Sequence, residues 1–217
     1  MLPTRDKAWG ALSIAPDFVP ITLSRRMTRF PQCLAPTCEE AVLLQSGSTV
    51  QLPKATPLFK AWRHDIPFDR YGRKAILDFR GEPLFAELVI LRLFDEAGWD
   101  GVWVDTYRHC FRVSVANRIE IPKDKLRLLE EVYAAAGAKG GCFDVFVWRG
   151  DEIMFAESKR AGRDRLRTSQ LRWLDAALRR GLQACSFLVV EWSLDKEPNH
   201  APQPTRLTGR GRALSLD

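Results

Sequence analysis

The chain has 217 residues, of which 46% are hydrophobic and 28% charged, and it carries a formal net charge of +6. This composition is ordinary for a globular domain and excludes a disordered or low-complexity protein. The sequence contains no run of about 18 apolar residues, so we expect neither a membrane span nor a secretory signal, and we predict a cytoplasmic protein.

The five cysteines form an odd, scattered set, which favours reduced thiols over a disulfide framework. Cys33 and Cys38 are the only close pair, and no second cysteine or histidine pair has the spacing that would complete a zinc site.

The first 80 residues are rich in proline and turn-forming residues and lack sustained periodicity. Two short features stand out, an apolar patch at residues 41–44 and a candidate strand at 49–52. We therefore predict an irregular N-terminal extension over residues 1–80. Met27 leaves open a start site later than Met1.

A folded domain is predicted over residues 81–197, followed by a flexible tail over 198–217. Its first element is a helix over residues 82–98, where an early proline suits the first helical turn and a glycine ends the element. The helix is apolar nearly all round, yet Glu87 lies in its middle. Because a buried lone carboxylate is costly, we expect Glu87 to be paired or linked to a metal.

Two short strands are predicted next, at residues 102–104, ending before Asp105, and at 111–115. A helix over residues 122–137 follows, opened by proline and closed by glycine. The segment 106–140 that contains this helix is interpreted as an insertion.

A β-hairpin is predicted from strands at about residues 143–148 and 153–159, joined by Gly150-Asp151 as a type II′ turn. This register places Asp144 directly opposite Glu157, and directly opposed residues have Cβ atoms roughly 4.5 to 5.5 Å apart. Lys159, two residues further on, points to the same face. Two carboxylates this close repel each other, so the pattern favours a divalent cation held by oxygen ligands, beside an ammonium group.

The rest of the domain is predicted to be a loop over residues 160–167, a helix capped by Thr168 or Ser169 and ending near residue 181, and a buried strand at 185–192. The alternation of helices and strands predicts an α/β sandwich around a mixed sheet, flanked by helices.

Positive charge is concentrated in the segment that begins at the end of the hairpin and follows it in the sequence. Residues 159–180 contain eight basic and two acidic residues, an excess of six that equals the formal net charge of the whole chain. A solvated helix face is the simplest explanation of such a cluster, and a polyanionic ligand is the functional one.

With Glu87, Asp144, Glu157, Lys159 and Gln170 identified, the order of elements resembles the PD-(D/E)XK nuclease superfamily, whose restriction-endonuclease-like core is αβββαβ. The segment SQLRWLDAAL, which includes Gln170, resembles the VRR-NUC branch. The resemblance covers roughly residues 82–194. It departs from the family pattern at Phe143, where the family has proline, and in the length of segment 106–140.

The resemblance implies a DNA nuclease that uses Mg²⁺ or Mn²⁺. Asp144, Glu157 and the backbone carbonyl of Ser158 would hold the metal, and Glu87 would complete its shell directly or through water. Lys159 would orient the attacking water or stabilise the transition state, and Gln170 would position the lysine or the phosphate. DNA, branched or flapped in the VRR-NUC branch, would contact five arginines: Arg160, Arg163, Arg165, Arg167 and Arg172. Small nucleases often dimerise to cut both strands, but the sequence identifies no interface.

Other interpretations stay open. Asp144 and Glu157 would then be an accidental cross-strand pair that Lys159 neutralises, and Glu87 an acid that reaches solvent or an arginine. A catalytically inactive nucleic-acid-binding module and an interaction subunit of a repair or defence assembly are the alternative functions.

Overall fold

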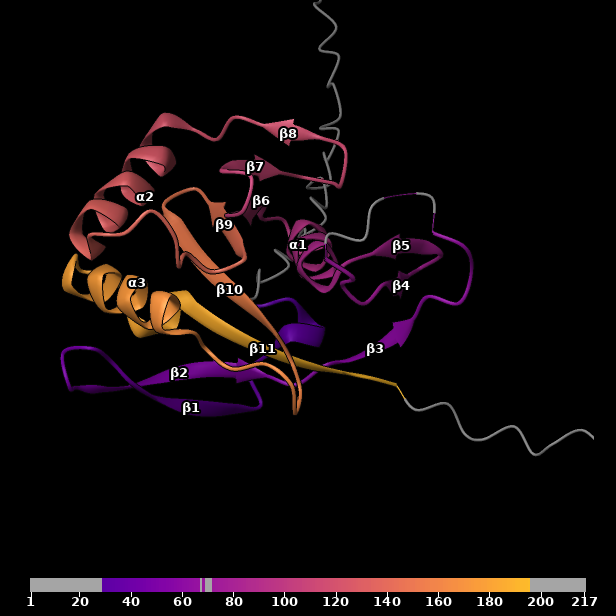
Figure 1. Ribbon diagram of the computed structural model, residues 1–217, viewed down its shortest axis with the longest axis horizontal. Coiled ribbons are helices and arrows are strands. Elements are labelled where there is room, and N and C mark those ends of the chain that lie inside the picture. The colour runs from indigo at the N-terminus through magenta and orange to yellow at the C-terminus, as the bar shows by residue number, and fades with distance from the viewer. Residues whose placement is uncertain (1–28, 67, 69–71, 196–217) are drawn as a thin grey trace, which may run out of the picture.

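The computed structural model describes residues 29–66, 68 and 72–195; Met1, Met27 and the tail 198–217 lie outside this range. Within the described residues the protein is α/β, with a mixed sheet of eleven strands and three α-helices on its two faces (Figure 1). In chain order the elements are β1 (Cys38–Leu43), β2 (Thr49–Ala55), β3 (Leu58–Ala61), β4 (Leu77–Phe79), β5 (Glu82–Leu84), α1 (Ala86–Glu96), β6 (Asp100–Asp105), β7 (Cys110–Arg112), β8 (Arg118–Ile119), α2 (Lys123–Ala136), β9 (Val145–Arg149), β10 (Glu152–Arg160), α3 (Thr168–Arg179) and β11 (Phe187–Leu194).

The main sheet has the order β5-β4-β3-β11-β10-β9-β6-β7-β8, and the β1–β2 hairpin joins it through β2 and β11. Strand β11 is parallel to β10, β2 and β3, whereas β9 is antiparallel to both β10 and β6. Since β10 and β11 run parallel, a crossover must connect them, and α3 supplies it.

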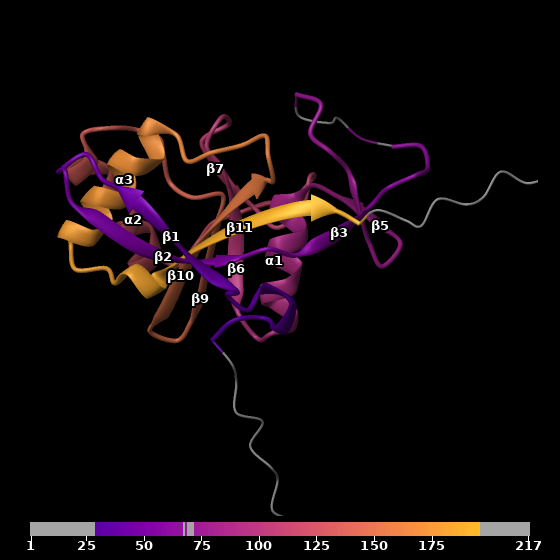
Figure 2. The ribbon, with the colours of Figure 1, turned by 90° about the horizontal axis from the view of Figure 1, so that it is seen from below.

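The two faces of the sheet carry separate hydrophobic cores. Val145 and Val147 of β9 pack with α1, whereas Phe146 and Trp148 pack on the other face with residues of α2 and α3. Figure 2 shows α1 on one side of the strands and α2 and α3 on the other. This alternation explains why β9 is apolar from Val145 to Trp148. Phe143, just before the strand, packs with the second core, on the α3 side.

The expectation that residues 1–80 are irregular is wrong for the described part of that region. Strands β1 to β4 lie in it, and β2 and β3 pair directly with β11. The predicted strand at residues 49–52 is the first half of β2. Strands β1 and β3 have few buried positions, so their periodicity is weak. The partner of β2 and β3, strand β11, lies more than a hundred residues away in the sequence.

The predicted start of the first helix is also wrong. Glu82 and Pro83 belong to strand β5, which pairs with β4, and α1 begins at Ala86. The β4–β5 turn explains the difference: Gly81 has a φ of 88°, and its N–H donates to Asp78 Oδ1 at 2.7 Å. Proline is tolerated here because β5 is the last strand at this edge of the main sheet order.

The remaining helices and strands agree with the prediction within a few residues, except the two-residue strand β8, which was not predicted. Helix α2 ends at Gly137 in the left-handed conformation, as its glycine indicated. Helix α3 begins one residue earlier than expected, so its N-cap is Arg167 instead of Thr168 or Ser169. No helix of the described residues is both long enough and apolar enough to cross a membrane.

Candidate functional site

The site is built at the open end of the β9–β10 hairpin. The predicted register is confirmed, because Arg149 pairs with Glu152, Trp148 with Ile153, and Val145 with Ala156. Gly150 has a φ of 58°, the positive value that the first residue of a type II′ turn requires. Continuing the same register brings Asp144 opposite Glu157, just beyond the last backbone pair.

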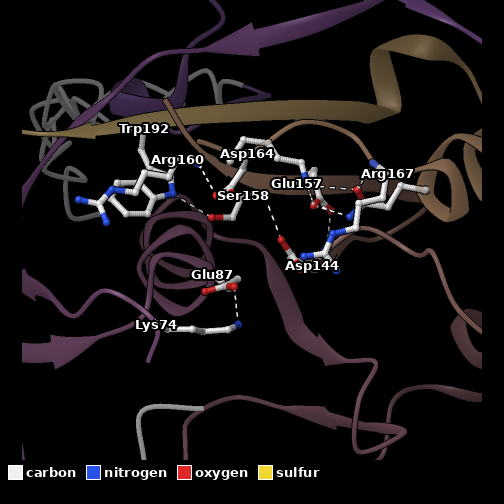
Figure 3. A network of polar contacts seen from close by, with 11 residues as sticks. Lys74, Glu87, Asp144, Glu157, Ser158, Arg160, Asp164, Arg167 and Trp192 are labelled. Carbon is white, nitrogen blue, oxygen red and sulfur yellow. Dashed lines mark hydrogen bonds and ion pairs between the residues drawn. The ribbon is translucent and has the colours of Figure 1, made fainter. Parts of the chain in front are cut away.

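Asp144 and Glu157 each accept a hydrogen bond from a backbone N–H of the opposing segment. The Asp144 N–H donates to Glu157 Oε2 at 3.1 Å, and the Ser158 N–H donates to Asp144 Oδ2 at 3.1 Å. Figure 3 shows Asp144 beside Ser158 and Glu157. The side chain of Glu157 is only 1% exposed, whereas Asp144 is partly buried at the wall of a pocket.

Lys159 and Gln170 complete the inner part of the site. Lys159 Nζ donates to Glu157 Oε1 at 2.5 Å and to Gln170 Oε1 at 3.1 Å, while Gln170 Nε2 donates to Glu157 Oε1 at 2.5 Å. Gln170 is itself held by the Arg167 N–H, which donates to its Oε1 at 2.9 Å. The first turn of α3 therefore delivers Gln170 to the end of β10, and all three side chains are buried.

Burial and like charge act together on the two acids. Desolvation raises the pKa of Asp144 well above its ordinary value, and the negative charges of Glu157 and Glu87 raise it further. Desolvation also raises the pKa of Glu157, although the charge of Lys159 and the hydrogen bonds from Lys159 and Gln170 oppose that rise. Asp144, Glu157 and Glu87 thus lie close enough for the charges of the two glutamates to act on the aspartate, a repulsion that a bound cation would relieve.

Glu87 lies in the same pocket but has a partner of its own. Lys74 Nζ donates to Glu87 Oε1 at 2.5 Å and lies 5.0 Å from the centre of the Trp103 ring. The expectation that Glu87 is paired is therefore confirmed, with a lysine. Sequence reasoning missed Lys74, because it precedes β4 in the region that was interpreted as an irregular extension.

A pocket of about 1180 Å³ surrounds these groups. Its wall includes all five predicted catalytic residues, Ser158 and four of the five predicted arginines: Arg160, Arg163, Arg165 and Arg167. Arg172 is exposed on α3 and does not line the pocket, and its predicted contact with DNA stays a prediction. The side chain of Arg160 lies over the ring of Trp192, with its guanidinium carbon 5.5 Å from the ring centre.

A second buried charge cluster, also missed from the sequence, lies beside this pocket. Asp105 at the end of β6 accepts a hydrogen bond from Arg112 Nε at 2.9 Å, and both residues are buried. The sequence could have indicated this ion pair, because a hairpin that pairs Asp105 with Cys110 brings Arg112 close to the aspartate.

The geometry is consistent with a cation site that depends on few protein ligands. Across the described residues, no group of three or more histidine, cysteine, aspartate or glutamate side chains converges closely enough to hold a metal ion by itself. Two carboxylates remain, Asp144 and Glu157, and hard divalent cations such as Mg²⁺ often use only one or two carboxylates with water and substrate phosphate.

Comparison with protein-family models, with curated proteins and with solved structures found no match.

Proposed function

We propose that the protein is a metal-dependent nuclease that hydrolyses phosphodiester bonds in DNA. The observation that carries this proposal is the convergence of Asp144, Glu157, Lys159 and Gln170 in one pocket with arginines in its wall. Acids, an ammonium and a basic rim together suit a reaction at a phosphate group, where negative charge must be bound and then stabilised. The proposal includes a restriction-endonuclease-like core formed by α1, β6, β9, β10, α3 and β11.

Asp144 and Glu157 fit the requirements of a Mg²⁺ or Mn²⁺ ion. Desolvation raises both pKa values and the charge of Glu157 raises the pKa of Asp144 further, and a bound cation would relieve both effects. Ser158 follows Glu157 in the chain and its N–H donates to Asp144, so its carbonyl is the candidate backbone ligand. Glu87 would take part through water because Lys74 already binds it. When bound, such an ion lowers the pKa of a coordinated water and neutralises charge on the phosphate.

The other residues bind and orient. Lys159 donates to Glu157 in the described arrangement, and a cation on Glu157 would weaken that ion pair and let the ammonium donate to a phosphate oxygen or to the attacking water. Gln170 holds Lys159 in place through its own anchor at Arg167. The exposed side chains of Arg163, Arg165 and Arg167 are available to contact the DNA backbone, which predicts affinity that falls steeply with salt.

A second candidate function is nucleic-acid binding without cleavage. The observation that favours it is the hydrogen bonding of Glu157, because both of its oxygens already accept bonds from protein donors. A site in this state has its acids satisfied without a metal, and the basic rim alone would retain DNA.

The test is cleavage of labelled single-stranded, duplex and flapped DNA by the purified full chain in Mg²⁺, Mn²⁺ or EDTA. We expect cutting with either metal, no cutting in EDTA, and loss of cutting in Glu157→Gln. Glu152→Gln is the matched control, because this exposed glutamate lies at the other end of the same strand.

Equal cutting by wild type and Glu157→Gln would contradict the nuclease proposal, as would the absence of cutting on every substrate. Salt-sensitive DNA binding without cutting would support the binding module instead. A thermal-melting series adds a readout independent of activity: Mg²⁺ or Mn²⁺ should raise the melting temperature of the wild type but not of Glu157→Gln, since a ligand that binds only the folded state stabilises it.

A further inference from the structure

The turn between β6 and β7 displays the most exposed aromatic side chain of the described residues. Tyr107 is 90% exposed, whereas all other phenylalanine, tyrosine and tryptophan side chains described lie in buried or partly buried positions. The tyrosine also lines the candidate active-site pocket. An aromatic ring so placed meets whatever enters the pocket.

Buried electrostatic contacts hold this turn in one conformation. Asp105, which is 4% exposed, accepts hydrogen bonds at Oδ1 from the Arg108 N–H at 3.2 Å and at Oδ2 from Arg112 Nε at 2.9 Å. Arg112 is anchored in turn, because its Nη1 donates to the Val115 carbonyl at 2.8 Å. His109 closes the turn with a φ of 49°, in the left-handed region. The ring of Tyr107 is therefore presented by a preorganised support.

The surroundings of Tyr107 indicate a nucleotide as its ligand. Arg108, next in the chain, also lines the pocket, as do Arg163, Arg165 and Arg167 from the loop between β10 and α3. A basic wall that tracks a phosphate backbone, combined with an aromatic ring on which a base can stack, is the chemistry that binds single-stranded nucleic acid. Bases inside a duplex are already stacked on each other and offer no face to a protein ring.

We propose that Tyr107 is a base-stacking contact and that the substrate carries an unpaired nucleotide next to the scissile phosphate. This inference rests on the proposed nuclease function and narrows its substrate class to DNA with a single-stranded segment. The buried Asp105–Arg112 pair acts as the positioning element of the contact, and Arg108 contributes positive charge beside it.

Binding in EDTA tests the contact separately from cleavage. Fluorescence anisotropy would compare a labelled single strand with the duplex made from it, for wild type, Tyr107→Ala and Tyr107→Phe. We expect the alanine variant to lose roughly 5- to 150-fold in affinity for the single strand, the range for one base stacked on an aromatic ring, and to keep its duplex affinity. The phenylalanine variant should bind like wild type, because it keeps the ring.

A 2-aminopurine base in the single strand gives a readout that a purely structural role would not move. Its fluorescence should be quenched on binding to wild type and Tyr107→Phe, but not to Tyr107→Ala. Leu43→Ala is the control, because Leu43 is 65% exposed on β1 and does not line the active-site pocket.

Two results would overturn the inference: equal single-strand affinity in wild type and Tyr107→Ala, or an equal loss for single strand and duplex. If the wild type cuts DNA and Tyr107→Ala binds the single strand as tightly as wild type, the base-stacking proposal fails and the nuclease proposal stands. If Tyr107-dependent single-strand binding is seen without any cutting, the nuclease proposal alone fails.

Discussion

The two ends of the β9–β10 hairpin are built from the same strands and differ in how they treat charge. At the turn end, Arg149 Nη2 donates to Glu152 Oε2 at 2.8 Å, and the side chain of Glu152 is 52% exposed. At the open end, Asp144 lies beside Glu157, whose carboxylate is paired with Lys159, and the side chains of Glu157 and Lys159 are 1% and 8% exposed. One end pairs opposite charges in water, and the other gathers like charges inside the protein.

The difference separates a structural pair from a candidate functional one. An exposed pair of opposite charges contributes little to stability and needs no further purpose. A buried surplus of negative charge costs stability, so it persists where another requirement outweighs that cost. Four predictions test this contrast, in order of the size of the expected effect.

The largest effect is expected at the glycines that flank the two ends. Gly141, just before the open end, has a φ of 98°, and a Cβ there would lie 2.1 Å from the Ser169 carbonyl oxygen at the start of α3. We expect Gly141→Ala to lower the free energy of unfolding by about 4 kcal/mol or more, since rigid backbone must move. Gly150→Ala at the turn should cost only about 1–2 kcal/mol, because its φ is positive but nothing lies within 4 Å of the added methyl. Urea denaturation measures the free energy of unfolding of each variant. Equal losses of that free energy in the two variants would refute the close packing of α3 on Gly141.

Removal of the buried ammonium should affect activity most. We expect Lys159→Ala to reduce the rate of DNA cleavage by about 10²- to 10³-fold, the usual effect of losing one donor that stabilises a charged transition state. Lys125→Ala is the control at the turn end, where Lys125 Nζ donates to the Gly150 carbonyl at 3.3 Å. Single-turnover kinetics measures the rates, and a similar rate for both variants would place Lys159 outside the chemistry.

The raised pKa values predict an unusual pH dependence of stability. Where a folded carboxyl has a raised pKa, the folded state binds more protons than the unfolded state between an ordinary carboxyl pKa near 4 and the raised value. The free energy of unfolding should therefore fall as pH rises through that interval. Asp144→Asn should weaken this dependence and stabilise the neutral-pH protein by about 1 kcal/mol. Denaturation at several pH values measures it, and a destabilised variant with an unchanged slope would show that Asp144 is already neutralised in the fold.

The smallest effect is expected at the exposed pair. Glu152→Gln should change the free energy of unfolding by less than about 0.5 kcal/mol and leave cleavage unchanged. Thermal melting and the cleavage assay measure the two quantities. A large loss of stability or of cleavage rate in Glu152→Gln would remove the contrast between the two ends of the hairpin.

Local patterns in the sequence were sufficient for the hairpin and its site. The glycine at position 150 sets the turn, the turn sets the register, and the register places Asp144 opposite Glu157, because each step depends only on neighbouring residues. The glutamine at the start of α3 was predicted in the same way, from helical spacing. Glu87 was expected in the middle of the first helix and lies instead in the first turn of α1, because α1 begins at Ala86.

Contacts between distant segments were not predictable. Lys74 reaches Glu87 from a region with no sustained periodicity, and strands β2 and β3 are defined by pairing with β11. Pro83 was interpreted as the start of a helix, because the turn that makes it a strand residue depends on the hydrogen bond that the Gly81 N–H donates to the Asp78 side chain.

The sequence by itself determined the α/β class, the β9–β10 hairpin and the identity of the acid, lysine and glutamine groups at its open end, because these follow from short-range periodicity and turn chemistry. Only the tertiary structure decided that Lys74 neutralises Glu87, that Arg172 lies outside the pocket, and that Tyr107 is held at its wall by a buried aspartate. Those outcomes depend on which segments contact each other in the folded chain. Periodicity can be read from neighbouring residues, whereas burial is decided only when the whole chain is folded.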